Sequence, residues 1–360
     1  MNREEQLKLL KDLTEANGIS GDEKEVSRIM KEYLKDSVDE FDYDNLGSLI
    51  ATKKGKEDLK IMLSGHIDEV GFIVSNIEEN GFLKMAPVGG WWGHVVPAHK
   101  VTIKTLDDKI YYGVVGSTPP HGMKPEVRNK VMEIKDMYVD LGVKNKQEVL
   151  DLGINIGDSI IPYTEFMVMN NPDFVCSKAF DDRIGAAVVV EVLNNLKGKE
   201  INASVYGVGS VQEEVGLRGA RTAAYKISPD VAIAIDVTLS HDVPNIEKTD
   251  CKLGNGVALS LMDSSVIANR GLLKLLRNIC LEKNIPFTYD SLTAGGTDSG
   301  EISKSRDGVL NMTLSLPCRY FHSHHSVVSL TDYNACIELL TEFVSRFDKN
   351  MLEEIKNSKK

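Results

Sequence analysis

The chain has 360 residues, of which 42% are hydrophobic and 26% charged, and a formal net charge of −11. This balance is that of a globular protein, and the length suggests one large domain with an insertion or two ordinary domains. The negative charge argues against a nucleic-acid partner, because the basic runs at 53–56 and 356–360 are short and mixed with acids. No apolar run approaches the roughly 18 residues that a membrane span requires, so we expect no membrane partner.

The cysteines and the N-terminus both bear on the compartment. The N-terminal residues Met1–Glu5 lead into an acidic amphipathic stretch and not into the apolar core of a secretory signal. The cysteines are odd in number and show no CxxC spacing, which argues for reduced thiols and against a thiolate zinc site. They are Cys176, Cys251, Cys280, Cys318 and Cys336. We therefore expect a cytoplasmic protein.

In chain order, apolar residues at helical spacing first predict helices over 3–16 and 22–36, with Ser20–Asp22 as the cap of the second. The apolar run Leu59–Gly65 then predicts a buried strand. From about 72 to 165, alternating segments are separated by turns rich in glycine, proline and aspartate, and no good helix candidate is present. This texture indicates a small β-rich unit, a barrel or a sandwich.

After residue 174 the pattern returns to strands alternating with helices, which indicates a largely parallel sheet. We predict a helix over 184–196 and a terminal helix over 331–357. The predicted strands are 203–210, 231–236, 257–262 and 312–316. The predicted fold class is thus α/β, a mixed, mostly parallel sheet flanked by helices. We assign 1–71 and 166–360 to an α/β domain and 72–165 to an inserted, barrel-like domain.

Five short segments place imidazoles or carboxylates at the carboxyl ends of predicted strands, where sites assemble in open α/β sheets. They are Gly65–Asp68, Phe180–Arg183, Gln212–Gly216, Ile235–Val237 and Tyr320–Ser323. Two imidazoles and several carboxylates without a thiolate suit zinc, cobalt or manganese in a hydrolytic site. The four positive charges of two divalent ions would be offset by three carboxylate ligands and a bridging hydroxide.

Each segment also has an ordinary structural explanation. A histidine at a strand end is often held by a local carboxylate, and adjacent acids such as Asp181–Asp182 or Glu213–Glu214 are often solvated loop charges. His322 lies beside His324 and His325, so another histidine of this stretch could be the ligand. The prediction of a metal site therefore depends on the five segments together.

Six motifs in order resemble those of the tetrahedral aminopeptidases, also called deblocking or glutamyl aminopeptidases, some of which carry a cellulase label. The motifs are GHIDEVGF, KAFDDRIGAA, VQEEVGLRGA, AIDV, AGGTDSGEI and RYFHSHHS. The resemblance covers nearly the whole chain, including the β-rich insertion. It implies a metal-dependent aminopeptidase that acts on short peptides and assembles into a large homo-oligomer.

Carried over residue by residue, the resemblance implies two divalent metal ions per chain, zinc or cobalt, with manganese as an alternative. His66, Asp181 and Asp236 would hold one ion. Asp181, Glu214 and His322 would hold the other, so that Asp181 bridges the pair.

The resemblance also assigns the groups that act beside the ions. Glu213 would be the general acid/base, taking a proton from the attacking water and delivering it to the departing amine. Asp68 would orient the imidazole of His66, a common way of fixing the tautomer of a histidine ligand. A non-proline cis peptide would join Asp181 to Asp182.

Other features have weaker interpretations. The glycine-rich loop 294–300 lacks the lysine of a P-loop, and we interpret it as a tight turn with a helix cap at Thr297 or Asp298. The resemblance places this loop beside the active site, which leaves a substrate-contacting role open as the alternative. Trp91 and Trp92 are expected to pack the core of the insertion. The roles of four residues stay open: His121, Arg319, His324 and His325.

Two rival functions belong to other classes. A glycoside hydrolase normally needs two carboxylates and no metal, which would leave the histidine motifs without a role. A non-catalytic assembly protein would fit a chain that lacked Glu213 or one of the ligands, and this sequence contains all of them.

Overall fold

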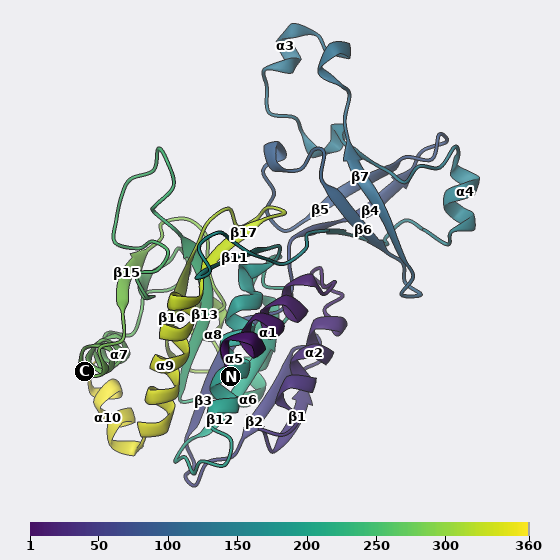
Figure 1. Ribbon diagram of the computed structural model, residues 1–360. Helices are drawn as coiled ribbons and strands as arrows, with labels where there is room; N and C mark the ends of the chain where they lie inside the picture. The colour runs from purple at the N-terminus through teal and green to yellow at the C-terminus, as the bar shows by residue number, and fades with distance from the viewer. Residues whose placement is uncertain (359–360) are drawn as a thin grey trace.

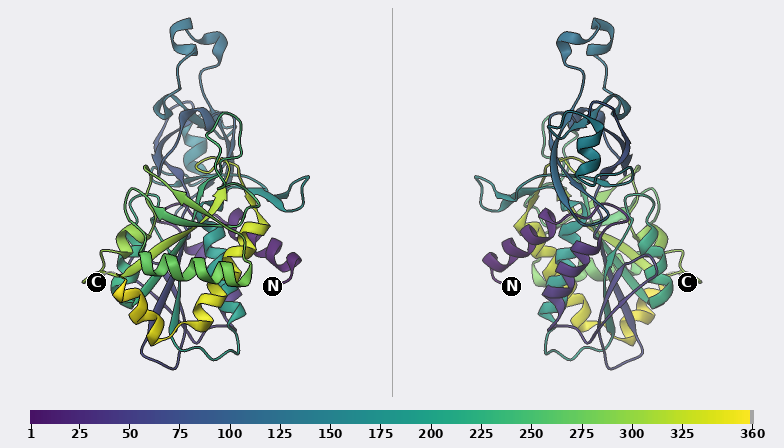
Figure 2. Two further views of the ribbon diagram at one scale, coloured as in Figure 1. Left: turned by 90° about the vertical axis from the view of Figure 1, so that its left-hand side faces the viewer. Right: turned by 90° about the vertical axis from the view of Figure 1, so that its right-hand side faces the viewer.

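A computed structural model describes residues 1–358 of the chain. An α/β unit contains both ends of the described chain, and a β-barrel projects from it (Figure 1). The two turned views in Figure 2 show the same division, with the barrel on one side of the α/β unit. An excursion of the chain, the segment that carries helix α3 (Pro125–Arg128), extends beyond the barrel (Figure 1). Within residues 1–358, no helix is long and apolar enough to cross a membrane.

The α/β unit is built on one eight-stranded sheet. Its strands are β1 (Glu40–Tyr43), β2 (Leu49–Lys53), β3 (Lys60–His66), β12 (Ser204–Ser210), β13 (Val231–Leu239), β14 (Val257–Met262), β15 (Phe287–Ser291) and β16 (Leu310–Cys318). They are ordered β1-β2-β12-β3-β13-β16-β14-β15. The four central strands β12, β3, β13 and β16 are parallel, whereas β2 and β14 join them antiparallel. The predicted mixed sheet with a parallel centre is confirmed.

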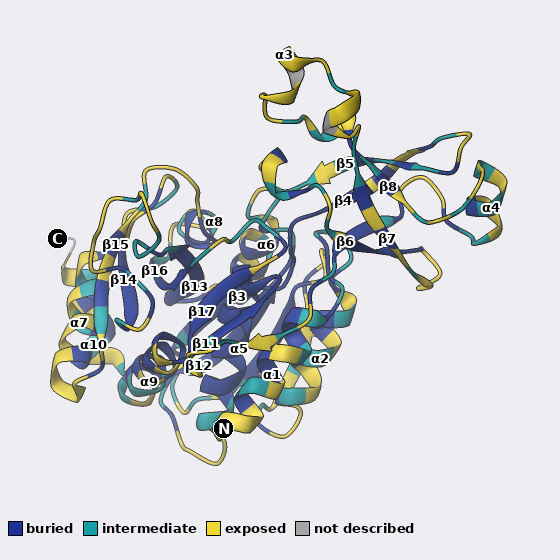
Figure 3. Cartoon of the chain, turned by 45° about the horizontal axis from the view of Figure 1, so that its top comes forward, coloured by how far each residue is buried: buried dark blue, intermediate teal, exposed yellow. Residues whose placement is uncertain are grey.

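Helices cover both faces of this sheet, and the strands between them are buried (Figure 3). The helices on the larger face are α1 (Arg3–Glu15), α2 (Lys24–Leu34), α5 (Phe180–Asn195), α7 (Arg270–Lys283), α9 (Leu330–Arg346) and α10 (Lys349–Asn357). The opposite face carries α6 (Arg218–Ile227) and α8 (Ser299–Ile302). Side chains alternate between the two faces along each strand, so Ile61 and Leu63 face α5 whereas Met62 faces α6.

The insertion forms a closed antiparallel barrel in the order β4-β5-β8-β7-β6-β9. Its strands are β4 (Gly71–Ile77), β5 (Leu83–Val88), β6 (Lys100–Lys104), β7 (Ile110–Gly116), β8 (Tyr138–Asp140) and β9 (Ser159–Pro162). An apolar cluster of its own, which includes Phe72, Val101 and Ile160, fills the interior. Closure leaves no free sheet edge, which is one way a small β unit is stabilised.

A three-stranded sheet links two segments of the predicted site. Its strands are β10 (Met167–Val168), β11 (Phe174–Ser177) and β17 (Ser326–Ser329), with β11 in the middle. The central strand leads into Asp181, and β17 follows His322 in the chain. The antiparallel pairing of β11 with β17 therefore brings these two residues close together.

Several predicted details were wrong. The terminal helix is two helices, because Phe347 is extended and Asp348 starts α10 by accepting a hydrogen bond from the backbone N–H of Met351. Ser20 does not cap α2, and its hydroxyl instead donates to Asp68 at 2.6 Å. The two helices predicted near the N-terminus are also shorter than expected.

The insertion departs from its prediction in two ways. It contains the short helices α3 (Pro125–Arg128) and α4 (Lys146–Asp151), and α4 is capped by the Asn145 side chain, which accepts from the N–H of Glu148. Trp91 stacks on Phe72 at 4.8 Å as a core residue should, but Trp92 is 61% exposed.

Candidate metal centre

The ends of the parallel strands bring the five predicted segments together. His66 ends β3, Asp236 lies in β13 three residues before its end, and Glu213–Glu214 begin three residues after the end of β12. Asp181 lies in the first turn of α5, and His322 lies between β16 and β17. All five segments thus contribute side chains to one place, as the strand ends predicted.

Asp181 lies between the two imidazoles. Its Oδ1 is 3.1 Å from Nε2 of His66, and its Oδ2 is 3.2 Å from Nε2 of His322. Glu214 Oε2 lies 3.5 Å from the same nitrogen of His322. One carboxylate that faces a different imidazole with each oxygen has the arrangement that a bridging ligand needs.

The donor atoms form two groups in which every ligand atom lies within 4.8 Å of the others. One group consists of His66, Glu213 and Asp236, and the other of His66, Asp181 and Glu214. The first group contains Glu213, which the sequence assigned to proton transfer, in place of the bridging Asp181.

These donors fit divalent cations chemically. Imidazole and carboxylate groups suit zinc, cobalt and manganese, and the groups described above contain no thiolate. Oε1 of Glu214 is buried and has no hydrogen-bond partner among residues 1–358. A buried oxygen left in this state is costly in a protein interior, and a cation would satisfy it.

Electrostatics favours a cation for the same reason. Burial, with the nearby Asp181 charge, raises the pKa of Glu214 to about 8, and burial raises the pKa of Asp236 well above its usual value. Burial opposes the charged form of His322, yet its contact with Asp181 and the charge of Glu214 raise the pKa of this imidazole to about 10. The negative charges of the buried carboxylates thus exceed the positive charge that the imidazoles provide, and divalent ions would supply the difference.

Asp68 is fully buried and contacts other groups besides His66, its predicted partner. Its Oδ1 lies 3.4 Å from Nδ1 of His66, but that nitrogen is closer, at 3.2 Å, to the backbone carbonyl of Asp68. The carboxylate accepts the backbone N–H groups of Glu213 at 3.0 Å and Glu214 at 3.2 Å, together with the Ser20 hydroxyl. Asp68 therefore fixes the loop that carries the two adjacent acids.

Sequence reasoning missed two supporting contacts. Asp182 accepts the backbone N–H of His66 at 3.1 Å, and its place beside Asp181 in the FDD motif was the available signal. The peptide between Asp181 and Asp182 is cis, as the resemblance implied. Nδ1 of His322 lies 2.9 Å from the carbonyl oxygen of Gly90, a backbone contact from the barrel that no side-chain pattern could reveal.

The structure places three of the residues whose roles the sequence left open. Arg319 makes a two-pronged pair with Asp242 at 2.8 and 2.7 Å. His324 is buried and stacks on His99 at 4.0 Å, and burial lowers its pKa to about 3. His121 is exposed in a short 3₁₀ turn of the chain's excursion from the barrel.

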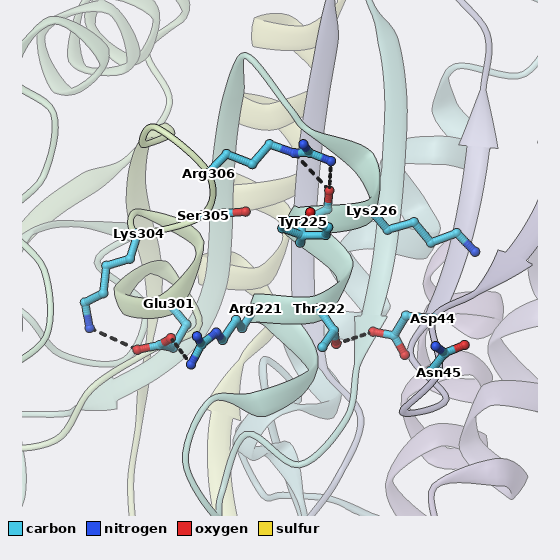
Figure 4. Close-up of a pocket in the computed structure, with 10 residues that line it drawn as sticks. All are labelled: Asp44, Asn45, Arg221, Thr222, Tyr225, Lys226, Glu301, Lys304, Ser305 and Arg306. Carbon is cyan, nitrogen blue, oxygen red and sulfur yellow. Dashed lines mark hydrogen bonds and ion pairs between the residues drawn. The ribbon is translucent and has the colours of Figure 1, made fainter.

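A cavity of about 860 Å³ lies apart from the metal centre, between α6 and the segment that follows α8 (Figure 4). Four cationic side chains line it: Arg221, Lys226, Lys304 and Arg306. Arg306 lies over the ring of Tyr225 and donates to the carbonyl of that residue. None of the candidate ligands lines this cavity, whereas Asp181, Glu214 and His322 line a separate small pocket.

The family model of M42 glutamyl aminopeptidases matches residues 47–339. A second, short model, AMPT, matches residues 4–30. Since the first match covers well over half of the chain, the chain belongs to the M42 glutamyl aminopeptidase family. It is thus an aminopeptidase, and the alternative of a non-catalytic assembly protein is set aside.

Curated aminopeptidases are similar to this chain along almost their full length. The putative aminopeptidase FrvX of Escherichia coli is 38% identical over 94% of this chain and 95% of its own. The lysyl aminopeptidase of Pyrococcus furiosus is 33% identical over 97% of both chains. The glutamyl aminopeptidase of Lactococcus lactis is 32% identical over 97% of this chain and 98% of its own.

Solved structures show the same fold. A TET aminopeptidase from a marine sediment thaumarchaeon superposes with a TM-score of 0.95 at 39% identity, over 99% of this chain and all of that one. Pyrococcus horikoshii TET1 peptidase, which can assemble into a tetrahedron or a large octahedral shell, gives 0.85 at 29% identity over 95% and 100%. A Thermotoga maritima protein described as an endoglucanase gives 0.77 at 28% identity over 96% and 99%.

Proposed function

We propose that the chain is a dinuclear metalloaminopeptidase that removes N-terminal residues from short peptides. The observation that carries the proposal is the position of Asp181, whose two oxygens lie 3.1 and 3.2 Å from Nε2 of His66 and His322. A carboxylate in this position can join two cations, each held by one of the two imidazoles.

In this proposal His66, Asp181 and Asp236 hold one ion, and Asp181, Glu214 and His322 hold the other. Zinc or cobalt fits the donors best, with manganese as an alternative. When bound, such ions activate water and polarise a peptide carbonyl.

Glu213 is the proton carrier of the proposed reaction. Burial raises the pKa of its carboxyl well above the usual value, which suits a group that must take up and then release a proton. Its Oε2 lies 3.9 Å from Nε2 of His66, beside the candidate ligands, and Asp68 fixes its backbone. Glu213 takes the proton of the attacking water and hands it to the departing amine.

Other features support the setting of this activity. The known shells of Pyrococcus horikoshii TET1 support a large homo-oligomer, and the closed barrel from Gly71 to Pro162 supports an inserted domain at 72–165 between the catalytic parts 1–71 and 166–360. All five cysteines are buried free thiols, which supports a reducing cytoplasm.

The rival function is that of an endoglucanase, the description of one structural relative. A glycosidase would use two carboxylates and leave both imidazoles that face Asp181 without a role. Metal dependence separates the two functions.

The test uses a panel of aminoacyl anilides. Protein freed of metal by chelation should not cleave them, and adding zinc, cobalt or manganese should restore cleavage of free but not N-acetylated substrates. The peptidase proposal would be refuted if chelated protein released reducing sugar from carboxymethylcellulose and metal-loaded protein cleaved no anilide.

A further inference from the structure

Asp298 is a buried carboxylate that is not among the candidate ligands. It is 2% exposed at the start of α8, and its side chain does not cap that helix, contrary to the prediction for this turn. Its Oδ2 accepts hydrogen bonds from the hydroxyls of Ser64, at 2.8 Å, and Ser210. Its Oδ1 is buried and has no hydrogen-bond partner in the described part of the chain.

The two serines belong to the strands that carry the metal centre. Ser64 lies in β3 two residues before His66, so both side chains point to the same face of the sheet. Ser210 ends β12, three residues before Glu213, and pairs in register with His66. Asp298 thus binds adjacent strand ends directly behind the site.

The turn that carries Asp298 is itself anchored farther along the sheet. The hydroxyl of Thr297 contacts that of Thr313 in β16 at 2.8 Å, and Thr313 also donates to Ser299 at 2.9 Å. Strand β13 lies between β16 and β3, and there it presents Ala234, the register partner of both Thr313 and Ser64. The small side chain of Ala234 leaves room for the turn to cross from β16 to β12.

We propose that Asp298 is a positioning residue of the metal centre. Acting through Ser64 and Ser210, it fixes the end of β3 relative to the end of β12, and hence His66 relative to Glu213. One oxygen of Asp298 accepts from the hydroxyls of both Ser64 and Ser210, so a single buried side chain can hold both strands. A carboxylate is also costly to bury on two donors alone, so simple packing does not account for it.

This inference rests on the proposed dinuclear function, and its test therefore measures cobalt binding as well as activity. The variants are Asp298→Ala, Asp298→Asn and the double change Ser64→Ala with Ser210→Ala. Ser305→Ala is the matched control, because Ser305 is also a buried serine near α8 but lines the separate cavity, and its hydroxyl has no hydrogen-bond partner within residues 1–358. Cobalt affinity is measured by competition with a chromophoric chelator, beside the visible spectrum of the bound ion and the unfolding temperature of the metal-free protein.

We expect Asp298→Ala and the double serine variant to bind cobalt about 10–100-fold more weakly, the usual cost of losing a group that supports metal ligands, with a changed spectrum. Asp298→Asn should stay within a few-fold of the parent, because its amide oxygen still accepts from both hydroxyls. Ser305→Ala should match the parent in affinity and spectrum.

Parent-like affinity and spectrum in Asp298→Ala would overturn the proposal. So would an Asp298→Asn variant as weak as Asp298→Ala, because the charge and not the hydroxyl contacts would then matter. If Asp298→Ala does not fold, the single variants Ser64→Ala and Ser210→Ala decide on the same readouts. A parent protein that binds cobalt but cleaves no aminoacyl anilide would refute the proposed function alone.

Discussion

Replacing Glu213 by glutamine separates proton transfer from metal binding. The glutamine side chain has the same size, and the backbone N–H of residue 213 can still donate to Asp68. The amide, however, cannot accept a proton from water. Loss of general acid–base catalysis costs about 10²–10⁴-fold in kcat, which corresponds to about 2.7–5.5 kcal/mol of activation free energy. We therefore expect a slow enzyme that still binds about two metal ions.

The adjacent change, Glu214→Gln, should act on the metal instead. Oε2 of Glu214 lies 3.5 Å from Nε2 of His322, and its Oε1 has no partner among the described residues, so both oxygens are placed to meet a cation. A neutral amide replaces a carboxylate ligand poorly. We expect the affinity of one site to fall by more than the roughly 100-fold that the loss of a supporting group can cost.

Metal content by mass spectrometry, measured beside kcat on an aminoacyl anilide, tests both expectations. The grouping of Glu213 with His66 and Asp236 makes the outcome informative, because Glu213 could itself be a ligand. Loss of metal in Glu213→Gln, with retention in Glu214→Gln, would show that the two roles are exchanged. Full activity in both variants would exclude this segment from catalysis.

Three further predictions follow from the same contacts. Asp68→Ala should lower kcat by about 10–100-fold, because the Glu213–Glu214 loop and Ser20 lose their common hydrogen-bond acceptor. Measuring kcat on an aminoacyl anilide together with metal content tests this. Metal affinity should increase with pH between 6 and 8, about tenfold per unit for each proton released, because metal-free His322 and Glu214 have pKa values raised to about 10 and about 8 and both must deprotonate to bind; calorimetry at several pH values measures this. Light scattering should give a particle many times heavier than the 39.8 kDa chain, and a monomer with full activity would contradict the assembly.

The sequence predicted those parts of the fold that depend on local patterns. Buried parallel strands are often apolar runs, so β3 and β12 were found within one residue of their bounds, whereas β13 and β16 are three and four residues longer than predicted. The prediction of one terminal helix failed at Phe347, which keeps the apolar period although its backbone is extended. Helical spacing alone could not reveal this break, because Asp348 starts the second helix with a capping contact within the same pattern.

Predicting the site required a different kind of signal. Ligand-type residues at strand ends and their order along the chain brought the five candidates together. The contacts of Gly90 and Ser20 could not be predicted from the sequence. Gly90 contacts His322 through its backbone carbonyl, and the hydroxyl of Ser20 donates to a residue distant in sequence, Asp68. The sequence predicted a cap at Thr297 or Asp298, because such residues commonly precede helices, and only the tertiary structure shows Asp298 bound to the sheet.

The structure also changes the charge balance inferred from the sequence. That balance counted three ligand carboxylates, but Asp68, Asp182 and Glu213 are also buried beside them. Asp68 and Glu213 differ in what sets their pKa values. Burial alone would raise the pKa of Asp68, yet its contacts with His66, Ser20 and the backbone hold it below the usual value, so it is a fixed anion. Burial raises the pKa of Glu213, whose Oε2 lies 3.9 Å from Nε2 of His66, and no hydrogen bond from Ser20 or the backbone offsets that effect as it does in Asp68 among the described residues. A fixed anion, Asp68, thus holds the backbone of Glu213, whose own carboxyl has the raised pKa that suits proton transfer.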